Sequence, residues 1–586
     1  MIVKMKKISI VVQSKDVEAT LKSLANAGVL HVEHQYVPTS DNILVLEERY
    51  RSLSEAIKIL SDTSKTEGHK NPEKIVRKIL DLVDKKDVLN EGIKKIKRDI
   101  GLWKEWGDFN PELIYDLEEK NIWVRLCRIT KKQLGQMPEG VILEELFRKG
   151  SVIYCAVITN GETALPFEAL QLPEQGLREM IANLEREKEK LRQVDEALQG
   201  LSKYKNALLS HQEKLASIIQ FSKVSTGMGR FERLSYVKGY CPMNNVKLLE
   251  DIARDEKWGL VVEDPSDDDN VPTLIKNPRW VEIIRPVFQM IKTIPGYKEV
   301  DISFWFLLFF SVFFGMLVGD AGYGAVIFII NLLCHLRFRD LENKSIFFLM
   351  YVLSVCAVLW GVLTGTFFGQ AWLSQMARPL LPSLRENANV QALCFFIGAI
   401  HLSIAHAWRL VRKAPSLKAF SELGWISILW AAYFLARTLI LGEVFPEQAR
   451  WLIIGGMTFI ILFTNPTKNI FRTIGSGIGS LFLNVINSFT DLISYIRLFA
   501  VGAATVAVAD AFNQMAMTIG FGNIFAGFAT SFILFFGHTL NILLGAMAIL
   551  VHGVRLNVLE FSGHLNMEWS GIEYAPFKAK GDQDGR

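Results

Sequence analysis

The fold is decided by the stretch SYIRLFAVGAA, residues 494–504, in which one permanent positive charge lies among apolar and small side chains. The stretch reads as the middle of a membrane-spanning helix. A guanidinium at bilayer depth costs at least ~3 kcal/mol, and it cannot escape the cost by losing its proton. Arg497 is therefore expected to face a cavity or a partner and to be functional, with a snorkelling arginine or a static ion pair as the alternative.

The apolar residues around this stretch are unevenly distributed along the 586-residue chain. Residues 1–298 are rich in charge, whereas residues 299–586 contain long apolar runs, which predicts a soluble arm followed by a membrane domain in the lipid bilayer. The net charge of +4 gives no reason to expect nucleic acid. Six cysteines without a CxxC pair fit a reducing compartment, and the N-terminal MIVKMKKISIVV reads as a strand rather than a cleavable signal.

The soluble arm repeats its pattern from both ends. Strand-like and helical patches predict a proximal α/β module built from residues 1–40 and 225–265 and a distal one from 111–169. Two charged helical runs, 45–110 and 170–222, predict an antiparallel coiled coil that joins the modules. No phosphate loop, zinc motif or nucleophile elbow occurs, so we expect no catalytic site, no cofactor and no metal.

The membrane domain is expected to be all-α, with eight spans. Residues 303–336 read as a tight helical hairpin, because Gly319-Asp320-Ala321-Gly322 interrupts a run too long for one span. Further spans are expected at 346–370, 390–411, 422–441, 450–465, 478–518 and 524–561, and the last two, each ~60 Å long, must tilt. Nine Lys and Arg in one set of loops against three in the other place both termini in the cytoplasm.

Polar and small residues recur with helical spacing on the last two spans. In the last span they are His538, Asn541, Gly545, Ala548, His552 and Arg555, and in the one before they are Asn487, Thr490, Ser494 and Arg497. Such faces could line a wet path for protons or ions, or form a hydrogen-bonded seam between helices. The candidate lining residues are Asn487, Thr490, Ser494, His538, Asn541, His552 and Glu560.

Other polar residues of the membrane domain have structural interpretations. His401 and His406, five apart, suit polar packing better than a shared metal. Asp320 is expected to cap the second helix of the hairpin rather than to conduct ions. Arg437 lies near the outer end of its span and is expected to snorkel.

Five motifs carry a resemblance to a known family. They are FFGMLVGDAGYG (313–324), GVLTGTFFG (361–369), GAIHLSIAHAW (398–408), SYIRLFAVGAA (494–504) and GHTLNILLGAMAILVHGVRLNVLEF (537–561). With MKKISIVV and YVKGYCP in the arm, they make the chain resemble the membrane subunit of rotary V/A-type ATPases, called subunit I or subunit a, along nearly its whole length.

The resemblance implies a stator of the inner or plasma membrane. A ring of c/K-type carrier subunits, each with a Glu or Asp, would pass Arg497, and Arg555 matches the family's second arginine. At an effective dielectric constant near 20, a pair at ~4 Å is worth ~4 kcal/mol, enough to keep the carrier carboxylate ionised. Two half-channels would carry H⁺ or Na⁺, and ATP would be made or hydrolysed by other subunits. E- and G-type peripheral stalks would bind the arm, and a central-stalk connecting subunit is implied.

Three departures from the family bear on the half-channels. Gly545 and Thr505 stand where the eukaryotic pattern has a carboxylate and a histidine, and the tail SGHLNMEWSGIEYAPFKAK lacks the expected glycine-rich run.

Two alternative functions from other classes of protein remain. One is a coiled-coil membrane scaffold or sensor, and the other is a secondary ion transporter, a class that favours repeated broken helices around a midplane site.

Overall fold

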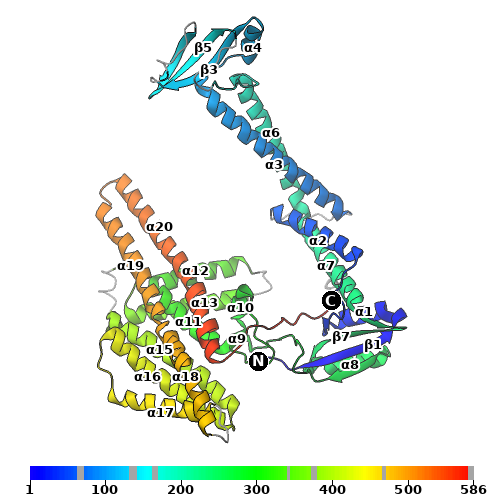
Figure 1. The fold of residues 1–586 in the computed structure, drawn as a ribbon, viewed down its shortest axis with the longest axis vertical. Helices are drawn as coiled ribbons and strands as arrows, with labels where there is room; N and C mark the ends of the chain where they lie inside the picture. The colour runs from blue at the N-terminus through cyan, green and yellow to red at the C-terminus, as the bar shows by residue number, and fades with distance from the viewer. Residues whose placement is uncertain are drawn as a thin grey trace. The chain divides into compact units, whose positions relative to one another are not determined.

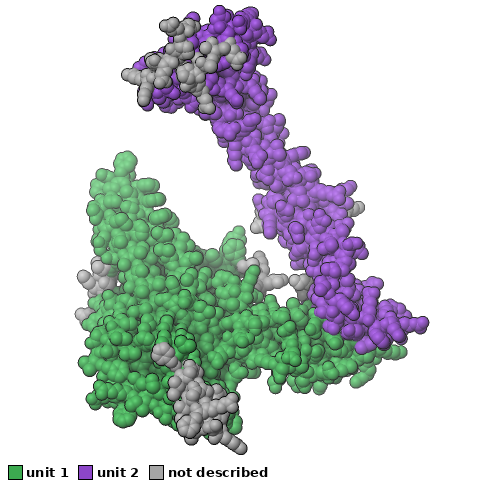
Figure 2. All heavy atoms as spheres, in the orientation of Figure 1, with its two compact units in different colours: residues 1–10, 29–33, 238–576 green, residues 11–28, 34–237, 577–586 purple. Residues whose placement is uncertain are grey.

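In the computed structural model, the described residues are 1–61, 71–130, 133, 141–161, 169–339, 344–370, 379–464 and 470–578, without the side chains of 470–480 and 482. They form two compact units (Figure 2). Unit 1 contains residues 1–10, 29–33 and 238–576, and unit 2 contains residues 11–28, 34–237 and 577–586.

Strands from both ends of the soluble half form one five-stranded sheet. Its order is β2 (His31–Glu33), β7 (Leu234–Pro242), β1 (Met5–Gln13) and β8 (Gly259–Glu263), with β6 (Gly229–Phe231) paired to β7. Alternate residues of β1 are buried, as its apolar alternation predicts. Helix α1 (Val17–Ala27) ends where Gly28 takes a left-handed conformation, and α8 is Val246–Asp255.

Unit 2 contains paired long helices and a second sheet. Helix α3 (Pro72–Trp103) packs against α6 (Leu177–Leu201), and α2 (Asp41–Ile59) packs against α7 (Lys205–Gly227) around Ala56, Ile79 and Leu208 (Figure 1). The second sheet has the antiparallel order β3 (Ile122–Thr130), β5 (Val152–Asn160), β4 (Ile142–Lys149), beside α4 (Pro111–Glu119). The α/β arm is confirmed, whereas coiled-coil supercoiling of these helices stays a prediction.

The expected interruption of the apolar run 303–336 is present, whereas a hairpin of two membrane spans stays a prediction. Helices α11 (Ser303–Val318) and α12 (Ala321–Arg337) meet at a bend of 119°. Gly319 has φ +68° at the turn, and the Asp320 carboxylate accepts hydrogen bonds from the backbone N–H groups of Gly322 and Tyr323 at 2.7 and 3.1 Å. Asp320 therefore caps α12, as the sequence predicts.

The remaining apolar helices follow in sequence (Figure 1). They are α13 (Ser345–Thr364), α15 (Asn387–Lys413), α16 (Phe420–Leu441), α17 (Glu447–Phe463), α18 (Ile470–Ile493), α19 (Ile496–Ile519) and α20 (Ile524–Ala548). Within the described ranges, five helical segments are long and apolar enough to cross a membrane, or six if the bent pair is one span. The eight spans expected from the sequence are therefore not confirmed as a count, since α17 and each half of the bent pair are short.

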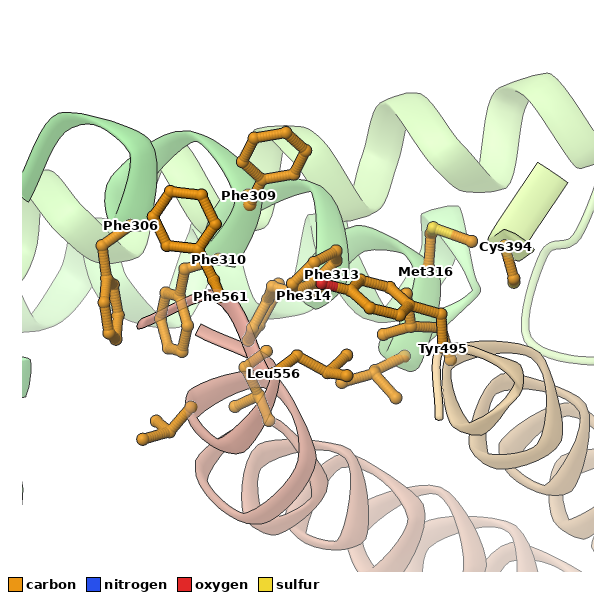
Figure 3. Packing of buried hydrophobic residues seen from close by; sticks show 14 of the residues in the cluster. Phe306, Phe309, Phe310, Phe313, Phe314, Met316, Cys394, Tyr495, Leu556 and Phe561 are labelled. Atoms are coloured by element: carbon orange, nitrogen blue, oxygen red, sulfur yellow. The ribbon is translucent and has the colours of Figure 1, made fainter. Parts of the chain in front are cut away.

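The core of the membrane half is aromatic. Phe306, Phe310 and Phe313 of α11 pack with two aromatic residues from the C-terminal helices (Figure 3). These are Tyr495, which directly precedes α19, and Phe561, which follows α20. All five side chains are buried, and each aromatic side chain buries a large apolar area. The helix that begins the membrane half is thus the core against which the Arg497 region packs.

Candidate functional site

Arg497 lies at a break between two helices, not inside a continuous one. The α18 helix ends at Ile493 and α19 begins at Ile496, with a turn at Ser494 and Tyr495. The Ser494 carbonyl accepts bonds from the backbone N–H of Arg497 at 3.2 Å and from its Nε at 2.9 Å. Leu483–Ile519 still forms one candidate membrane span, so the interpretation of 494–504 as the middle of a spanning helix holds. At this turn the local hydrogen bonds shorten to i→i−3, and the arginine side chain binds the exposed carbonyl.

A buried carboxylate joins the two arginines that the sequence singled out. Arg497 Nη2 lies 2.5 Å from Glu560 Oε1, and Arg555 Nε lies 3.6 Å from the same oxygen. The Glu560 side chain is 4% exposed, that of Arg497 22% and that of Arg555 54%. The cluster therefore holds two positive charges and one negative charge, so one positive charge remains uncompensated within it.

The helix that carries Arg555 and Glu560 has two π-helical turns, at Ile549–Gly553 and Leu556–Phe561. A π turn contains an extra residue and rotates everything that follows, and such turns are frequent at functional sites. The single polar face expected from His538 to Arg555 assumed α-helical spacing throughout. In the structure this spacing ends at Ala548, and the buried face continues through Ile549, Gly553 and Asn557.

His401 clamps the helix break to the π-helical segment. Its fully buried ring stacks between Phe309 and Phe561, with ring centroids 3.8 and 4.2 Å away. Its Nδ1 is 2.8 Å from the Tyr495 hydroxyl, beside Arg497. The sequence interpretation of His401 as a polar packing residue is confirmed, but the partners that it joins could not be read from its spacing.

A second polar cluster lies beside the α11–α12 bend. The Tyr323 hydroxyl is 2.7 Å from His538 Nδ1, and Asn541 Nδ2 donates to that hydroxyl at 3.1 Å and to the Thr505 carbonyl at 2.8 Å. Asn541 is buried, and its Oδ1 has no hydrogen-bond partner among the described residues. The structure thus brings together His538, Asn541 and a tyrosine that sequence reasoning missed.

A third cluster surrounds a polar cavity of about 360 Å³. Glu422 is buried in it and binds His406 at 2.7 Å, Arg409 at 3.1 Å and Lys413. His406 Nε2 is 2.9 Å from His564 Nδ1, and His564 Nε2 is 3.2 Å from Asp491 Oδ2. Hydrogen-bonded titratable groups therefore continue from α15 and α16 to α18.

Sequence reasoning missed most of this cavity cluster. Asn487, predicted as a lining residue, does line the cavity. Glu422 could have been found as the lone carboxylate of an apolar run that follows a basic loop. His564 and Asp491 carry no such signal, because their partners lie 158 and 73 residues away.

The other predicted residues are not drawn into these clusters. The Thr490 hydroxyl donates to the Ile486 carbonyl at 2.9 Å, and the Ser494 hydroxyl donates to the Thr490 carbonyl at 3.0 Å. His552 is half-buried, and its Nδ1 has no hydrogen-bond partner among the described residues. Within the described ranges, no group of three or more His, Cys, Asp and Glu could hold a metal ion.

The comparisons with known proteins point to one family. No protein-family model matches the chain. The chain is 32% identical over 618 residues to the V-type ATP synthase subunit I of Borreliella burgdorferi, with 99% of each chain covered. It is 29% identical over 629 residues to the V-type ATP synthase subunit I 1 of Treponema pallidum, covering 99% of this chain and 100% of that relative.

More distant relatives have the same subunit name. The A-type ATP synthase subunit I of Methanocaldococcus jannaschii is 23% identical over 452 residues, covering 70% of this chain and 64% of its own. A crystal structure of the cytoplasmic N-terminal domain of subunit I, homolog of subunit a, of V-ATPase covers 44% of this chain and 99% of its own at 13% identity, with a TM-score of 0.23, too low for comparing folds. Identity of 32% along the whole length confirms the resemblance in the motifs, and the chain belongs to the V-type ATP synthase subunit I family.

Proposed function

We propose that this chain is the stator of the membrane motor, forming ion half-channels against a rotating ring of carrier subunits. Its relatives are subunits I of ATP synthases, and several of its helices are apolar enough to cross a membrane. The observation that carries the proposal is the Arg497–Glu560–Arg555 cluster, with its net positive charge and a half-buried Arg497. A ring carboxylate that passes it is attracted in its ionised form and releases its ion.

In this mechanism, the Glu560 carboxylate pairs with the arginines while no ring carboxylate is present. Burial of an unpaired guanidinium is expensive, and an internal carboxylate offsets part of that cost while no carrier is present. Glu560 Oε1 lies within reach of both arginines, so either guanidinium can keep this partner when the other turns to the ring. Two arginines sharing one carboxylate thus keep a positive charge at the ring while forming a barrier to direct passage of cations.

The other two clusters supply candidate half-channels. The cavity with His406, Glu422 and His564 contains charged groups that water can reach, and the loop-charge bias assigns its end of the membrane half to the cytoplasm. The Tyr323–His538–Asn541 cluster lies beside the α11–α12 bend, which the loop-charge bias assigns to the outer side, and is the candidate for the second path. Hydrogen-bonded histidines, tyrosine and carboxylates of this kind are suited to proton relay.

The proposal includes a location and partners. The soluble arm and both termini lie in the cytoplasm, the membrane is the cell membrane, and peripheral stalks of E and G type and a central-stalk connecting subunit dock there. The chain itself performs no ATP chemistry.

The test is ATP-driven ion pumping by the assembled complex in vesicles, comparing wild type with Arg497→Ala and Arg497→Lys. Arg437→Ala is the matched control, because Arg437 is another arginine of the membrane half and is paired at 2.6 Å with Glu443. We expect both Arg497 variants to stop pumping while ATP hydrolysis and assembly persist, and the control to pump. Pumping by Arg497→Ala near the wild-type rate would falsify the stator role. Ion flux without the ATPase head would favour the secondary transporter.

A further inference from the structure

A cavity of about 490 Å³ lies where the first apolar helix begins. Its walls come from residues 273–277, the short helices α9 (Arg279–Glu282) and α10 (Arg285–Ile291), the loop after α10, the first residue of α11 and Glu573–Tyr574. Small-molecule sites typically measure roughly 300–1,000 Å³. The cavity is distinct from the three polar clusters of the membrane helices.

Charged side chains around this cavity leave one cation and one anion unpaired. Arg285 Nη1 lies 3.1 Å from Glu282 Oε1, so these two charges compensate each other. Lys292 and Glu573, both exposed residues at the mouth of the cavity, also line it, and neither forms an ion pair with another described residue. A ligand that carries both a phosphate and an ammonium group complements this pair.

The backbone of Lys292 is strained. Lys292 has φ +53° and ψ +33°, a left-handed conformation that costs a residue other than glycine roughly 1 kcal/mol. Such strain persists mostly where a ligand or a switch uses it. The adjacent Thr293 Oγ1 is buried and has no hydrogen-bond partner among the described residues, so the same loop offers a free polar group.

The helices that form the wall are amphipathic. Ile284 and Val287 are buried against the α11 core, whereas Trp280 and Met290 are 60% and 53% exposed. Trp280 makes an edge-to-face contact with Phe304 of α11, with ring centroids 5.6 Å apart. An exposed tryptophan packed on the first turn of an apolar span is typical of the membrane–water interface, and on this basis we infer that the cavity opens at headgroup level.

We propose that this cavity binds a membrane phospholipid with a phosphoethanolamine headgroup. Its phosphate binds Lys292, its ammonium group binds Glu573, and its glycerol and first acyl carbons lie along the apolar wall at Ile284 and Phe288. The lipid fixes the junction between the soluble sheet and the first membrane helix. The proposal holds whether or not Arg497 is the stator charge.

The experiment uses the assembled complex in liposomes that contain a trace of phosphatidylethanolamine with a photoreactive group on an acyl chain near the glycerol. Cross-linked peptides are mapped by mass spectrometry, and we expect labelling within residues 273–303. Lys292→Ala and Glu573→Gln are each expected to reduce it about tenfold, the effect of losing one charged hydrogen bond. Lys298→Ala and Glu568→Gln, which alter the lining of a separate cavity, are the matched controls and leave labelling unchanged.

A further variant separates binding from folding. Lys292→Gly relieves the left-handed strain, so it raises thermal stability and still lowers the labelling about tenfold, as Lys292→Ala does. Undiminished labelling in Lys292→Gly, or equal labelling by a diacylglycerol probe without a headgroup, overturns the proposal.

Two probes distinguish the ligand chemistry. Phosphatidylglycerol with the same photoreactive chain should label less, because it lacks the ammonium group that binds Glu573. Equal labelling by it overturns the assignment of Glu573. Soluble phosphoethanolamine in excess should not compete, and full competition by it overturns the membrane lipid in favour of a free metabolite.

Discussion

Glu560 interacts with Arg497 and Arg555 through one oxygen, while its other oxygen is buried without a hydrogen-bond partner among the described residues. The carboxylate is therefore only partly compensated, as a group with a temporary partner should be. A static ion pair, the alternative interpretation of Arg497, would be expected to satisfy both oxygens.

We expect Glu560→Gln to be more damaging to stability than the double variant Arg497→Ala with Glu560→Gln. The single change leaves the half-buried Arg497 without its ion-pair partner, which costs roughly 1–3 kcal/mol, whereas the double change removes both charges. Thermal unfolding of the purified chain in detergent measures the difference. Additive losses in the two single variants would show that the two groups are not coupled.

The sequence predicts the two arginines and includes Glu560 among the candidate lining residues, but it does not predict that both arginines pair with Glu560. Arg497 is evident because a charge inside an apolar run has few explanations. Its pairing with Glu560, 63 residues away, depends on the helix break and the π turns, which no periodicity encodes. Local pattern identifies the unusual residue, and tertiary packing decides what it contacts.

At the scale of elements, the His401 ring contacts two irregular segments of the chain. One is the turn between α18 and α19, and the other is the second π-helical turn. Tyr495 belongs to the break and Phe561 to the second π turn. Gly398 permits this contact, because a Cβ there would lie 2.7 Å from the Tyr495 ring. The irregularities are thus held by packing around one buried histidine.

Tyr495→Phe tests this clamp, because it removes only the hydroxyl bonded to His401. We expect a loss of about 1 kcal/mol in stability and a lower number of ions pumped per ATP, since Arg497 is then less firmly placed. The control is Tyr433→Phe, which removes the hydroxyl bonded to Arg437. An unchanged pumping ratio in Tyr495→Phe would restrict the clamp to stability.

The distal sheet provides a second test at this scale. Cys127 and Cys155 are cross-strand neighbours on β3 and β5, and both are buried. Burial raises the pKa of Cys127 to about 12 and raises that of Cys155 as well. Because the reactive thiolate is then scarce at every pH up to about 9, we expect neither thiol to react with maleimide until the sheet unfolds.

The measurement is mass-spectrometric mapping of maleimide adducts at pH 7 and pH 9, with and without denaturant. Cys334, which is half-buried in α12, is an internal comparison. Rapid labelling of Cys127 in the native protein would contradict the packing of this sheet.

The sequence predicts an α/β first half and an all-helical second half, but it does not predict the number of membrane spans. Apolar length and loop charge locate α13, α15 and α16 well, because each is one run between polar loops. The eight-span expectation counted the bent pair as two spans and α17 as another. The break divides this run into α11 and α12, which are each short and meet at a bend of 119°. The length of the apolar run alone does not reveal this.

At the scale of the whole molecule, the C-terminal tail connects the last membrane helix to the first sheet within unit 1. Thr273 N–H donates to the Ile572 carbonyl at 2.7 Å, and Tyr574 N–H donates to the Thr273 carbonyl at 3.2 Å. The Tyr574 hydroxyl donates to the Val29 carbonyl at 2.6 Å, and the Ala575 N–H donates to His31 Nδ1 at 3.0 Å. The helix that carries Arg555 is thereby tied to β2.

Tyr574→Ala should release this tie. We expect hydrogen exchange in peptides covering residues 29–33 and 571–576 to accelerate about tenfold or more, because a charge-free hydrogen bond and a stacked ring are lost together. Tyr574→Phe keeps the ring and is the control for packing. Unchanged exchange in Tyr574→Ala would show that the tail does not hold the sheet.

The hydrogen bonds between the C-terminal tail and the β2 region also limit when the first sheet can be completed during synthesis. The bond between Ala575 and His31 spans 544 residues of sequence. At roughly 5–20 residues per second, a ribosome needs about half a minute to two minutes between making the two partners. The first sheet therefore waits, incomplete at its β2 edge, until every membrane helix has been inserted. A nascent chain stalled before residue 574 should accordingly remain protease-sensitive around residue 31, so the closing of this edge reports that Tyr574 and Ala575 have been made.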